Sequence, residues 1–247
     1  MRNNLNLNVR KYVVPDPADE DSPSWVSKRE IPSSLEIKGE DDDAGKEEEL
    51  EVPVNRVHAP WESKENYLEC HYQLLREDAI SPLRQAVAEV RESPFMHEKT
   101  SVEDAAIYNK VFIVGFTFAN SGIAARISFS VERVGKKILW DQSKRLLTGT
   151  IVALTTKEDK FQNICLVAVV AARPLAGLEQ NPPEINIFFA APEEIEIDPQ
   201  QEWLMVECRN GFFEAARHTL KSLQKMSKER WVSSIGSSFC HAKPTFV

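Results

Sequence analysis

The chain has 247 residues, a formal net charge of −8 and 42% hydrophobic residues, so it is long enough for one or two domains with a sizeable core. Its longest apolar runs, such as 164–172, are too short to span a bilayer, and its first residues lead into no apolar signal core, which argues against a membrane or secreted protein. The four cysteines lie far apart and form no CxxC pair, which argues against a zinc site or a disulfide framework and favours a reduced compartment, the nucleus or the cytoplasm.

The first 57 residues are predicted to be a disordered acidic tail. Residues 1–60 hold 14 acidic and 8 basic side chains, and the stretch from Glu36 to Glu51 is mostly acidic. A segment with so few long apolar runs cannot readily offset the entropy lost on ordering. Removal of residues 1–56 is therefore expected to leave the thermal stability almost unchanged.

Two helices are predicted over residues 64–92. Ser63 can cap the first helix, whose apolar residues recur at helical spacing. Proline is poorly tolerated deep in a helix, but Ser81 and Pro82 suit the cap and the first position of a second helix. The sequence therefore predicts that the two helices meet at a bend beside Pro82.

The pattern changes to that of strands from residue 107. Apolar and aromatic residues run almost unbroken to Phe118, and further strand-like runs follow at 123–131, 149–155, 164–172, 184–189 and 203–206. Turn signals separate these runs, which indicates a small antiparallel barrel or sandwich. A helical pattern then extends from Gly211 to Met226. The expected fold class is α+β, a small antiparallel β-barrel flanked by helical stalk segments over residues 58–226, with an irregular tail over 227–247.

Three segments of the chain resemble one protein family. They are Tyr67 to Arg84, with matches at Tyr67, Leu68, His71, Leu74 to Asp78 and Pro82 to Arg84; Trp140 to Leu154; and Met205 to Glu207 followed by Phe213 to His218. The family is the superfamily-one RNA helicases that carry NFX-type zinc fingers, and its fungal members include a helicase of RNA-interference-dependent heterochromatin. The chain resembles the N-terminal accessory module that precedes the motor, while the motor and the zinc fingers are absent from it.

The resemblance implies a barrel on helical stalks and a place in RNA silencing. In the related helicases of nonsense-mediated decay, such a barrel precedes the first motor lobe, which agrees with the predicted order of elements. From Ser227 onward the sequence does not resemble the continuation into that lobe. We therefore expect a truncated family member, a splice form or a gene-model fragment.

A basic, aromatic-flanked loop is the candidate RNA-binding surface. Residues 107–174 carry an excess of six positive charges in an otherwise acidic chain. The candidate RNA-contacting residues are Lys136, Lys137, Trp140, Lys144 and Arg145. Lysine and arginine would contact phosphates and tryptophan would stack on a base. The alternative is a solvated turn in which Trp140 and Leu146 close the end of the barrel.

A second set of charged residues is predicted to make structural or interdomain contacts. It comprises Arg76, Glu77, Asp78, Arg84 and Arg217. These residues either form ion pairs that dock a helix onto the barrel or contact a neighbouring lobe. Glu214 and His218 lie four residues apart, but a catalytic zinc motif needs a second histidine, so no metal site is predicted.

No catalytic residue and no cofactor are predicted. The stretch from Gly39 to Lys46 lacks the glycine spacing of a phosphate loop and the Ser or Thr that follows its lysine. We therefore expect no ATP hydrolysis by this chain. The favoured hypothesis is a non-catalytic accessory module of an RNA helicase that contacts RNA, the motor lobe or silencing-complex proteins. The alternative is a stand-alone adaptor that binds proteins.

Overall fold

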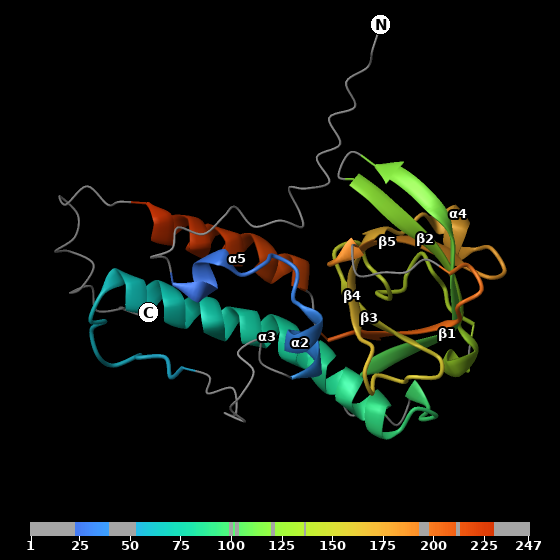
Figure 1. Cartoon of the computed structure of the whole chain (residues 1–247), viewed down its shortest axis with the longest axis horizontal. Coiled ribbons are helices and arrows are strands. Elements are labelled where there is room, and N and C mark those ends of the chain that lie inside the picture. Colours follow the sequence, from blue (N-terminus) through green and yellow to red (C-terminus); the bar gives the residue numbers. More distant parts are fainter. Residues whose placement is uncertain are drawn as a thin grey trace, which may run out of the picture.

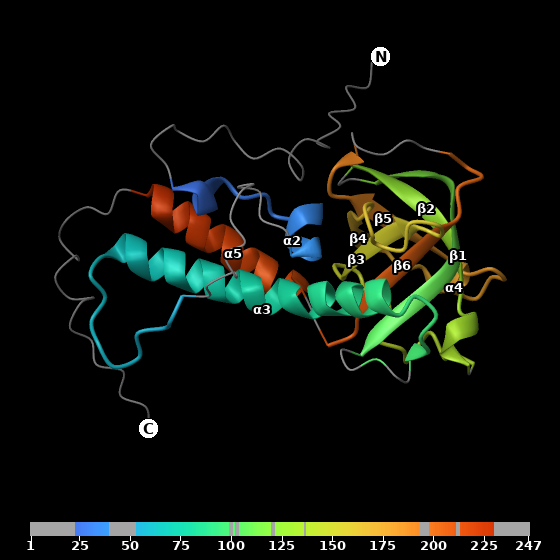
Figure 2. The ribbon, with the colours of Figure 1, turned by 60° about the horizontal axis from the view of Figure 1, so that its bottom comes forward.

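The molecule consists of a β-barrel and a stalk of two long helices that runs away from it (Figure 1). The computed structural model describes residues 23–39, 53–98, 101, 104–119, 122–135, 137–192, 198–210 and 213–229. A second view shows the same two helices side by side, with the short helix α2 (Ser34–Lys38) lying over them near the barrel (Figure 2). No helix in this described part combines the length and the apolar character that crossing a bilayer requires.

Six antiparallel strands close the barrel in the order β1-β2-β5-β4-β3-β6. Their bounds are β1 Ala105–Ala119, β2 Gly122–Ser130, β3 Ile151–Thr156, β4 Leu166–Ala172, β5 Glu184–Phe189 and β6 Trp203–Cys208. Two short helical turns, η3 (Glu132–Val134) and α4 (Leu175–Leu178), lie in the connections. The structure confirms the predicted α+β class and the small antiparallel barrel.

Both faces of the barrel wall on the stalk side are buried. Successive residues of a strand point to opposite faces, so Val152 of β3 lies in the interior cluster, whereas its neighbours Ile151 and Ala153 pack toward the stalk. Every residue of β6 is buried. This double burial explains why these strands read as continuous apolar runs.

Helix α3 (Lys64–Glu92) begins as predicted, but it does not break at the proline. The Ser63 side chain caps it by accepting a hydrogen bond from the Asn66 N–H at 3.1 Å. Pro82 lies inside one continuous helix, so the prediction of two helices was wrong. Proline removes only the hydrogen bond to the carbonyl four residues earlier, at Asp78, which is exposed to water. One apolar stripe from Leu68 to Val90 packs on both sides of this position and holds the helix together.

Helix α5 (Phe213–Lys228) runs back along α3 and completes the stalk. At the barrel end, Gly149 lies so close to α5 that a β-carbon there would stand 2.7 Å from Cβ of Glu214. At the far end, Lys64 Nζ donates a hydrogen bond to the Glu229 carbonyl at 3.1 Å. The shorter α5 therefore lies antiparallel to the N-terminal part of α3.

Part of the predicted disordered tail is folded, which corrects the boundary placed at residue 57. The turn η1 (Ser24–Ser27) and α2 pack on the stalk, and Trp25, Val26, Ile31 and Ile37 are buried in the same core as α3 and α5. These four apolar residues supply the buried area that the acidic composition concealed. The predictions for residues 1–22, 40–52 and 230–247 lie outside the described residues.

Candidate functional site

The predicted RNA-binding loop divides into exposed and buried residues. Lys137 and Lys144 are exposed, and Lys136 lies outside the described residues. Trp140 is half-buried against the interior cluster, with its ring 6.2 Å from that of Phe129. Arg173 also lies over this ring, with its guanidinium 6.0 Å from the Trp140 ring centroid and its Nη2 donating to the Trp140 carbonyl at 2.6 Å. The ring therefore already has two packing partners within the fold.

Arg145 is not a surface cation. It is 6% exposed, and its guanidinium donates two hydrogen bonds to the Glu98 carboxylate, Nη1 to Oε1 at 3.1 Å and Nη2 to Oε2 at 2.5 Å. Glu98 also accepts the Ile107 N–H at 3.0 Å. In this conformation Arg145 is inaccessible to a phosphate, and its role is to fasten the loop to the segment between α3 and β1.

A buried acid extends this polar cluster into the barrel. Glu207 of β6 accepts hydrogen bonds from the Tyr108 hydroxyl at 2.9 Å and from the Leu146 N–H at 2.8 Å. Arg145 Nη1 lies 3.4 Å from the Tyr108 oxygen. Burial raises the pKa of Glu207 to about 7, and burial, followed by the nearby Glu207 carboxylate, raises the pKa of Tyr108 well above 10.0. The cluster joins four separate segments of chain.

Sequence reasoning missed Glu98 and Glu207 as structural residues. A signal existed for Glu207, because one carboxylate within the apolar run Trp203–Cys208 must be buried with partners. Glu98 gave no such signal, since it lies in a polar connection. Its partner Arg145 is 47 positions away.

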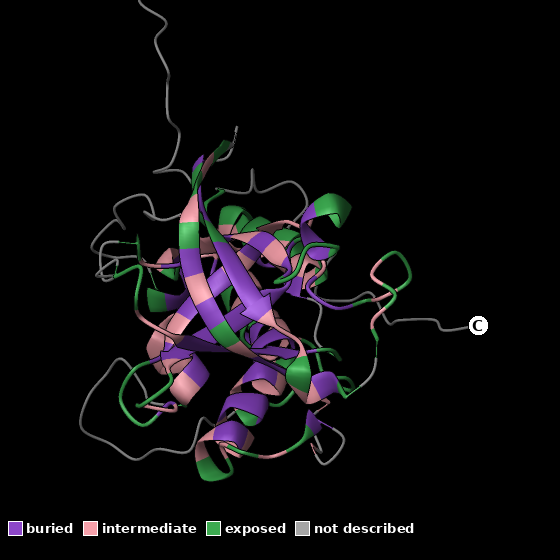
Figure 3. Ribbon diagram, turned by 90° about the vertical axis from the view of Figure 1, so that its right-hand side faces the viewer, coloured by how far each residue is buried: buried purple, intermediate pink, exposed green. Residues whose placement is uncertain are grey.

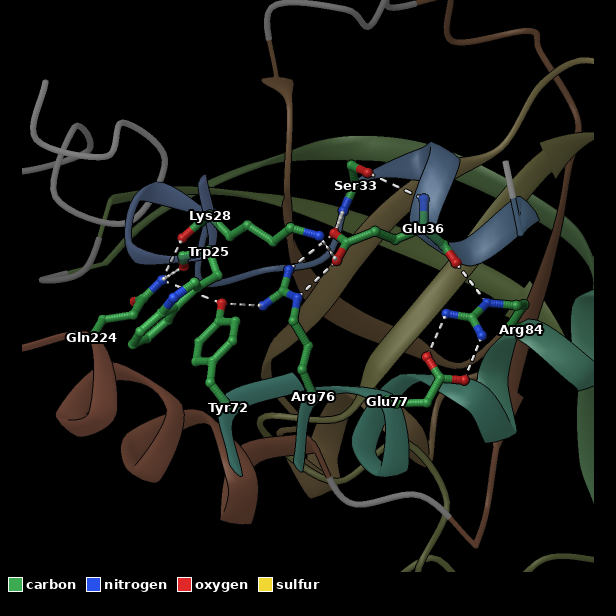
Figure 4. A network of polar contacts seen from close by, with 9 residues as sticks. All are labelled: Trp25, Lys28, Ser33, Glu36, Tyr72, Arg76, Glu77, Arg84 and Gln224. Carbon is green, nitrogen blue, oxygen red and sulfur yellow. Dashed lines mark hydrogen bonds and ion pairs between the residues drawn. The ribbon is translucent and has the colours of Figure 1, made fainter. Parts of the chain in front are cut away.

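The predicted contact residues of α3 hold α2 rather than the barrel (Figure 4). Arg76 donates to both oxygens of Glu36, Nε to Oε1 at 2.7 Å and Nη2 to Oε2 at 2.9 Å, and its Nη1 donates to the Tyr72 hydroxyl at 3.3 Å. Burial acts to raise the pKa of Glu36, but the hydrogen bond and positive charge of Arg76 lower it below its usual value. The ionised pair therefore persists inside the stalk.

Arg84 and Glu77 form a second clamp on the same helix. Arg84 donates to Glu77 from Nη1 at 2.6 Å and from Nη2 at 3.0 Å, and its Nε donates to the Glu36 carbonyl at 2.8 Å. Figure 4 shows the two arginines rising from α3 to opposite sides of Glu36. Asp78, the remaining member of the predicted set on α3, is exposed. Arg76, Glu77 and Arg84 thus form ion pairs that hold α2, whereas the prediction placed such contacts at the barrel or a neighbouring lobe.

Arg217 makes the matching contact on α5. It donates to Glu214 from Nε at 2.7 Å and from Nη2 at 2.6 Å, and Nη1 contacts the Glu30 carboxylate of the segment between η1 and α2. His218 lies 3.2 Å from Glu214, but no group of three metal-ligating side chains occurs among the described residues. The N-terminal segment is therefore fastened to both stalk helices by arginine–carboxylate pairs.

Comparisons with known proteins find similarity over the barrel and over further parts of the chain. A family model described as the ZNFX1 domain matches residues 100–209. "Helicase required for RNAi-mediated heterochromatin assembly 1" of Schizosaccharomyces pombe is 40% identical over 207 residues, 84% of this chain and 19% of the relative. "NFX1-type zinc finger-containing protein 1" is 31% identical in Homo sapiens and 32% in Mus musculus over 179 residues, 71% of this chain and 9% of each relative. The chain thus spans less than a fifth of these relatives' length, and no solved structure matches it.

Proposed function

We propose that this chain, which belongs to the ZNFX1-domain family, works as a non-catalytic accessory module of an RNA helicase in RNA silencing. One observation carries the proposal. The family match, residues 100–209, coincides with the barrel from just before β1 to just after β6. An alignment of 207 residues with the fission-yeast helicase is too long for the barrel alone, so the similarity extends into the stalk. Barrel and stalk together are therefore the unit that the helicase relative shares.

In such a helicase, ATP hydrolysis would be carried out by regions other than this chain. A phosphate loop needs four residues between its glycines and a Ser or Thr after its lysine, and Gly39 to Lys46 has neither. The purified chain should show no magnesium-dependent ATP turnover. Saturable nucleotide binding with turnover by the chain itself would contradict the non-catalytic role.

RNA is the proposed ligand of the exposed part of the basic loop. Lys137 and Lys144 are the candidates that remain at the surface, because Arg145 is held by Glu98. Replacement of both lysines by alanine should weaken binding of single-stranded RNA and flatten its salt dependence by about 0.7 in slope per lost phosphate contact. Replacement of both Lys225 and Lys228 of α5, which are exposed, by alanine is the matched control for the loss of two positive charges.

The measurement is a titration of single-stranded RNA at several salt concentrations. Unchanged affinity and slope in the double variant would overturn RNA binding by this loop. The stand-alone adaptor would then take precedence, with the motor lobe or silencing-complex proteins as candidate partners in the nucleus or cytoplasm. One observation favours that second function: large apolar side chains are exposed on the hairpin of β1 and β2. Binding through such a surface should depend little on salt.

A further inference from the structure

The outer half of the β1–β2 hairpin has an open edge. β1 pairs with β6 only as far as Val111↔Trp203, but it pairs with β2 to Ala119↔Gly122. From Phe112 onward, β1 therefore has a neighbour on one side only among the described strands. Figure 3 shows this part of the hairpin rising clear of the other ribbons. Every second residue along such an edge presents its N–H and C=O groups without a strand partner.

One face of the open hairpin is apolar and exposed. Phe116 is 47% exposed, Phe118 is 74% exposed and Ile123 is 42% exposed. Phe118 lies directly opposite Ile123, and Phe116 lies opposite Ala125, so all four share one face. Ala125 belongs to the interior cluster, and the exposed residues therefore continue the lining of the barrel beyond its rim.

The chemistry of this edge favours a polypeptide strand over a nucleic acid. Binding of single strands combines stacking with cations that contact the phosphates. The exposed cation of the outer half of the hairpin as described, Arg126, lies opposite Gly115 on the other face, where it donates to Thr117 at 3.1 Å. An extended peptide instead supplies both the backbone groups for the open edge and alternating side chains for the apolar face.

A segment of this chain has the required pattern. Leu5, Leu7 and Val9 alternate with Asn6 and Asn8, which is the period of a strand with one apolar face. We propose that residues 5–9 add to the open edge of β1 beyond Val111, with their three apolar side chains on Phe116, Phe118 and Ile123. Since Pro15 cannot donate to a ladder, the added strand ends before it.

The connecting chain is long enough for this contact. Thirteen residues, 10–22, separate the proposed strand from Pro23, and in extended form they reach about 43 Å. Trp25, two residues after Pro23, packs on Tyr72 of α3 with the ring centroids 5.0 Å apart. From Tyr72, α3 runs about 30 Å to its last residue, Glu92, which lies beside the barrel. Tethering also gives the segment an effective concentration of roughly millimolar order, which favours even a weak strand pairing.

Hydrogen exchange of the full chain tests this proposal. The variant combines Leu5→Asn, Leu7→Asn and Val9→Asn, and the matched control combines Asn6→Ser and Asn8→Ser on the opposite face. Amides of residues 112–119 should exchange at least about tenfold faster in the apolar-face variant, and at the native rate in the control. A synthetic peptide of residues 3–14 added to the variant should restore the protection.

Three outcomes would overturn the proposal. The first is equal exchange of residues 112–119 in the native chain and the variant. The second is protection that increases with protein concentration, because the occupant would then be a second copy. The third is protection that appears only with poly(U) RNA, because the face would then bind nucleic acid. An unchanged melting temperature in all variants shows that the hairpin and barrel stay folded.

Discussion

The guanidinium of Arg76 forms a bidentate pair with the carboxylate of Glu36, with Nε 2.7 Å from Oε1 and Nη2 2.9 Å from Oε2. The same carboxylate accepts the Ser33 N–H at 2.9 Å, while the Ser33 hydroxyl accepts the Glu36 N–H at 3.2 Å. Glu36 therefore closes the N-terminus of α2 in a capping box and fixes that helix to the stalk. One side chain determines both the start of α2 and its position.

Arg76→Ala should lower the free energy of unfolding by about 3–5 kcal/mol, because it removes the paired hydrogen bonds to the part-buried Glu36 and leaves only Lys28, whose Nζ lies 3.9 Å from Oε1, as a counter-charge. Urea unfolding measures the loss. Asp78→Ala, an exposed change on the same helix, should stay within about 0.5 kcal/mol of the native chain. A loss below about 1 kcal/mol for Arg76→Ala would show that water replaces the ion pair at little cost.

Removal of residues 1–39 should strongly lower the melting temperature. The deletion takes away Trp25, Val26, Ile31 and Ile37, and each buried apolar side chain of this size contributes roughly 1.5–3 kcal/mol as an upper estimate. Removal of residues 1–22 is the control, since it spares all four. Equal melting temperatures for the two deletions would mean that η1 and α2 contribute little to the core.

Glu207→Gln should change how stability depends on pH. The pKa of Glu207 is raised by burial from 4.5 to about 7. The folded state therefore keeps a proton that the unfolded chain releases, so this stabilising contribution is complete below about pH 4.5 and is lost as the pH rises to 7. The stability of the native chain relative to the variant should fall by roughly 1–3 kcal/mol over that window.

Urea unfolding at a series of pH values measures this difference. Glu214→Gln serves as a control of opposite sign, because the hydrogen bond from Arg217 lowers the pKa of Glu214 and its contribution is lost as the pH falls. Parallel profiles for the native chain and Glu207→Gln would show that Glu207 titrates near its ordinary value.

Pro82→Ala should stabilise the protein by roughly 1–3 kcal/mol. The substitution restores the missing donor in the middle of α3 and removes the clash of the ring with the preceding turn, worth about 3 kcal/mol in a helix interior. Greater freedom of the unfolded chain offsets about 0.4–1 kcal/mol of this gain. Pro82→Gly should gain less, since glycine is a poor helix former. A destabilised alanine variant would indicate that the ring itself packs well.

Local sequence patterns predicted most of the helices and strands, because the residues that determine each of these elements lie within it or directly beside it. Alternation and β-branched content located the strands, and Ser63 located the start of α3. The contacts that were missed join distant positions. The pair Trp25-Val26 and the residue Ile37 stand in mostly polar surroundings. The sequence around them is therefore typical of an unstructured segment, although α3 and α5 supply the surface that buries them.

The candidate sites were harder to predict because charge does not reveal burial. Lys144 and Arg145 are neighbours in sequence, yet one is exposed and the other is 6% exposed beside Glu98. The arginines of α3 form ion pairs, but their partner α2 could not be identified from sequence spacing. Glu36 lies 40 positions before Arg76 in the acidic stretch.

The contact between Lys64 and Glu229 places the entrance and the exit of the stalk together. The barrel lies toward the opposite end of the stalk from this pair of helix ends. A helix of 29 residues is about 43 Å long, so a tilt of about 10° at the base would carry the barrel sideways by about 7 Å. A small rotation of the stalk about this pair of helix ends would thus displace the barrel by several ångströms.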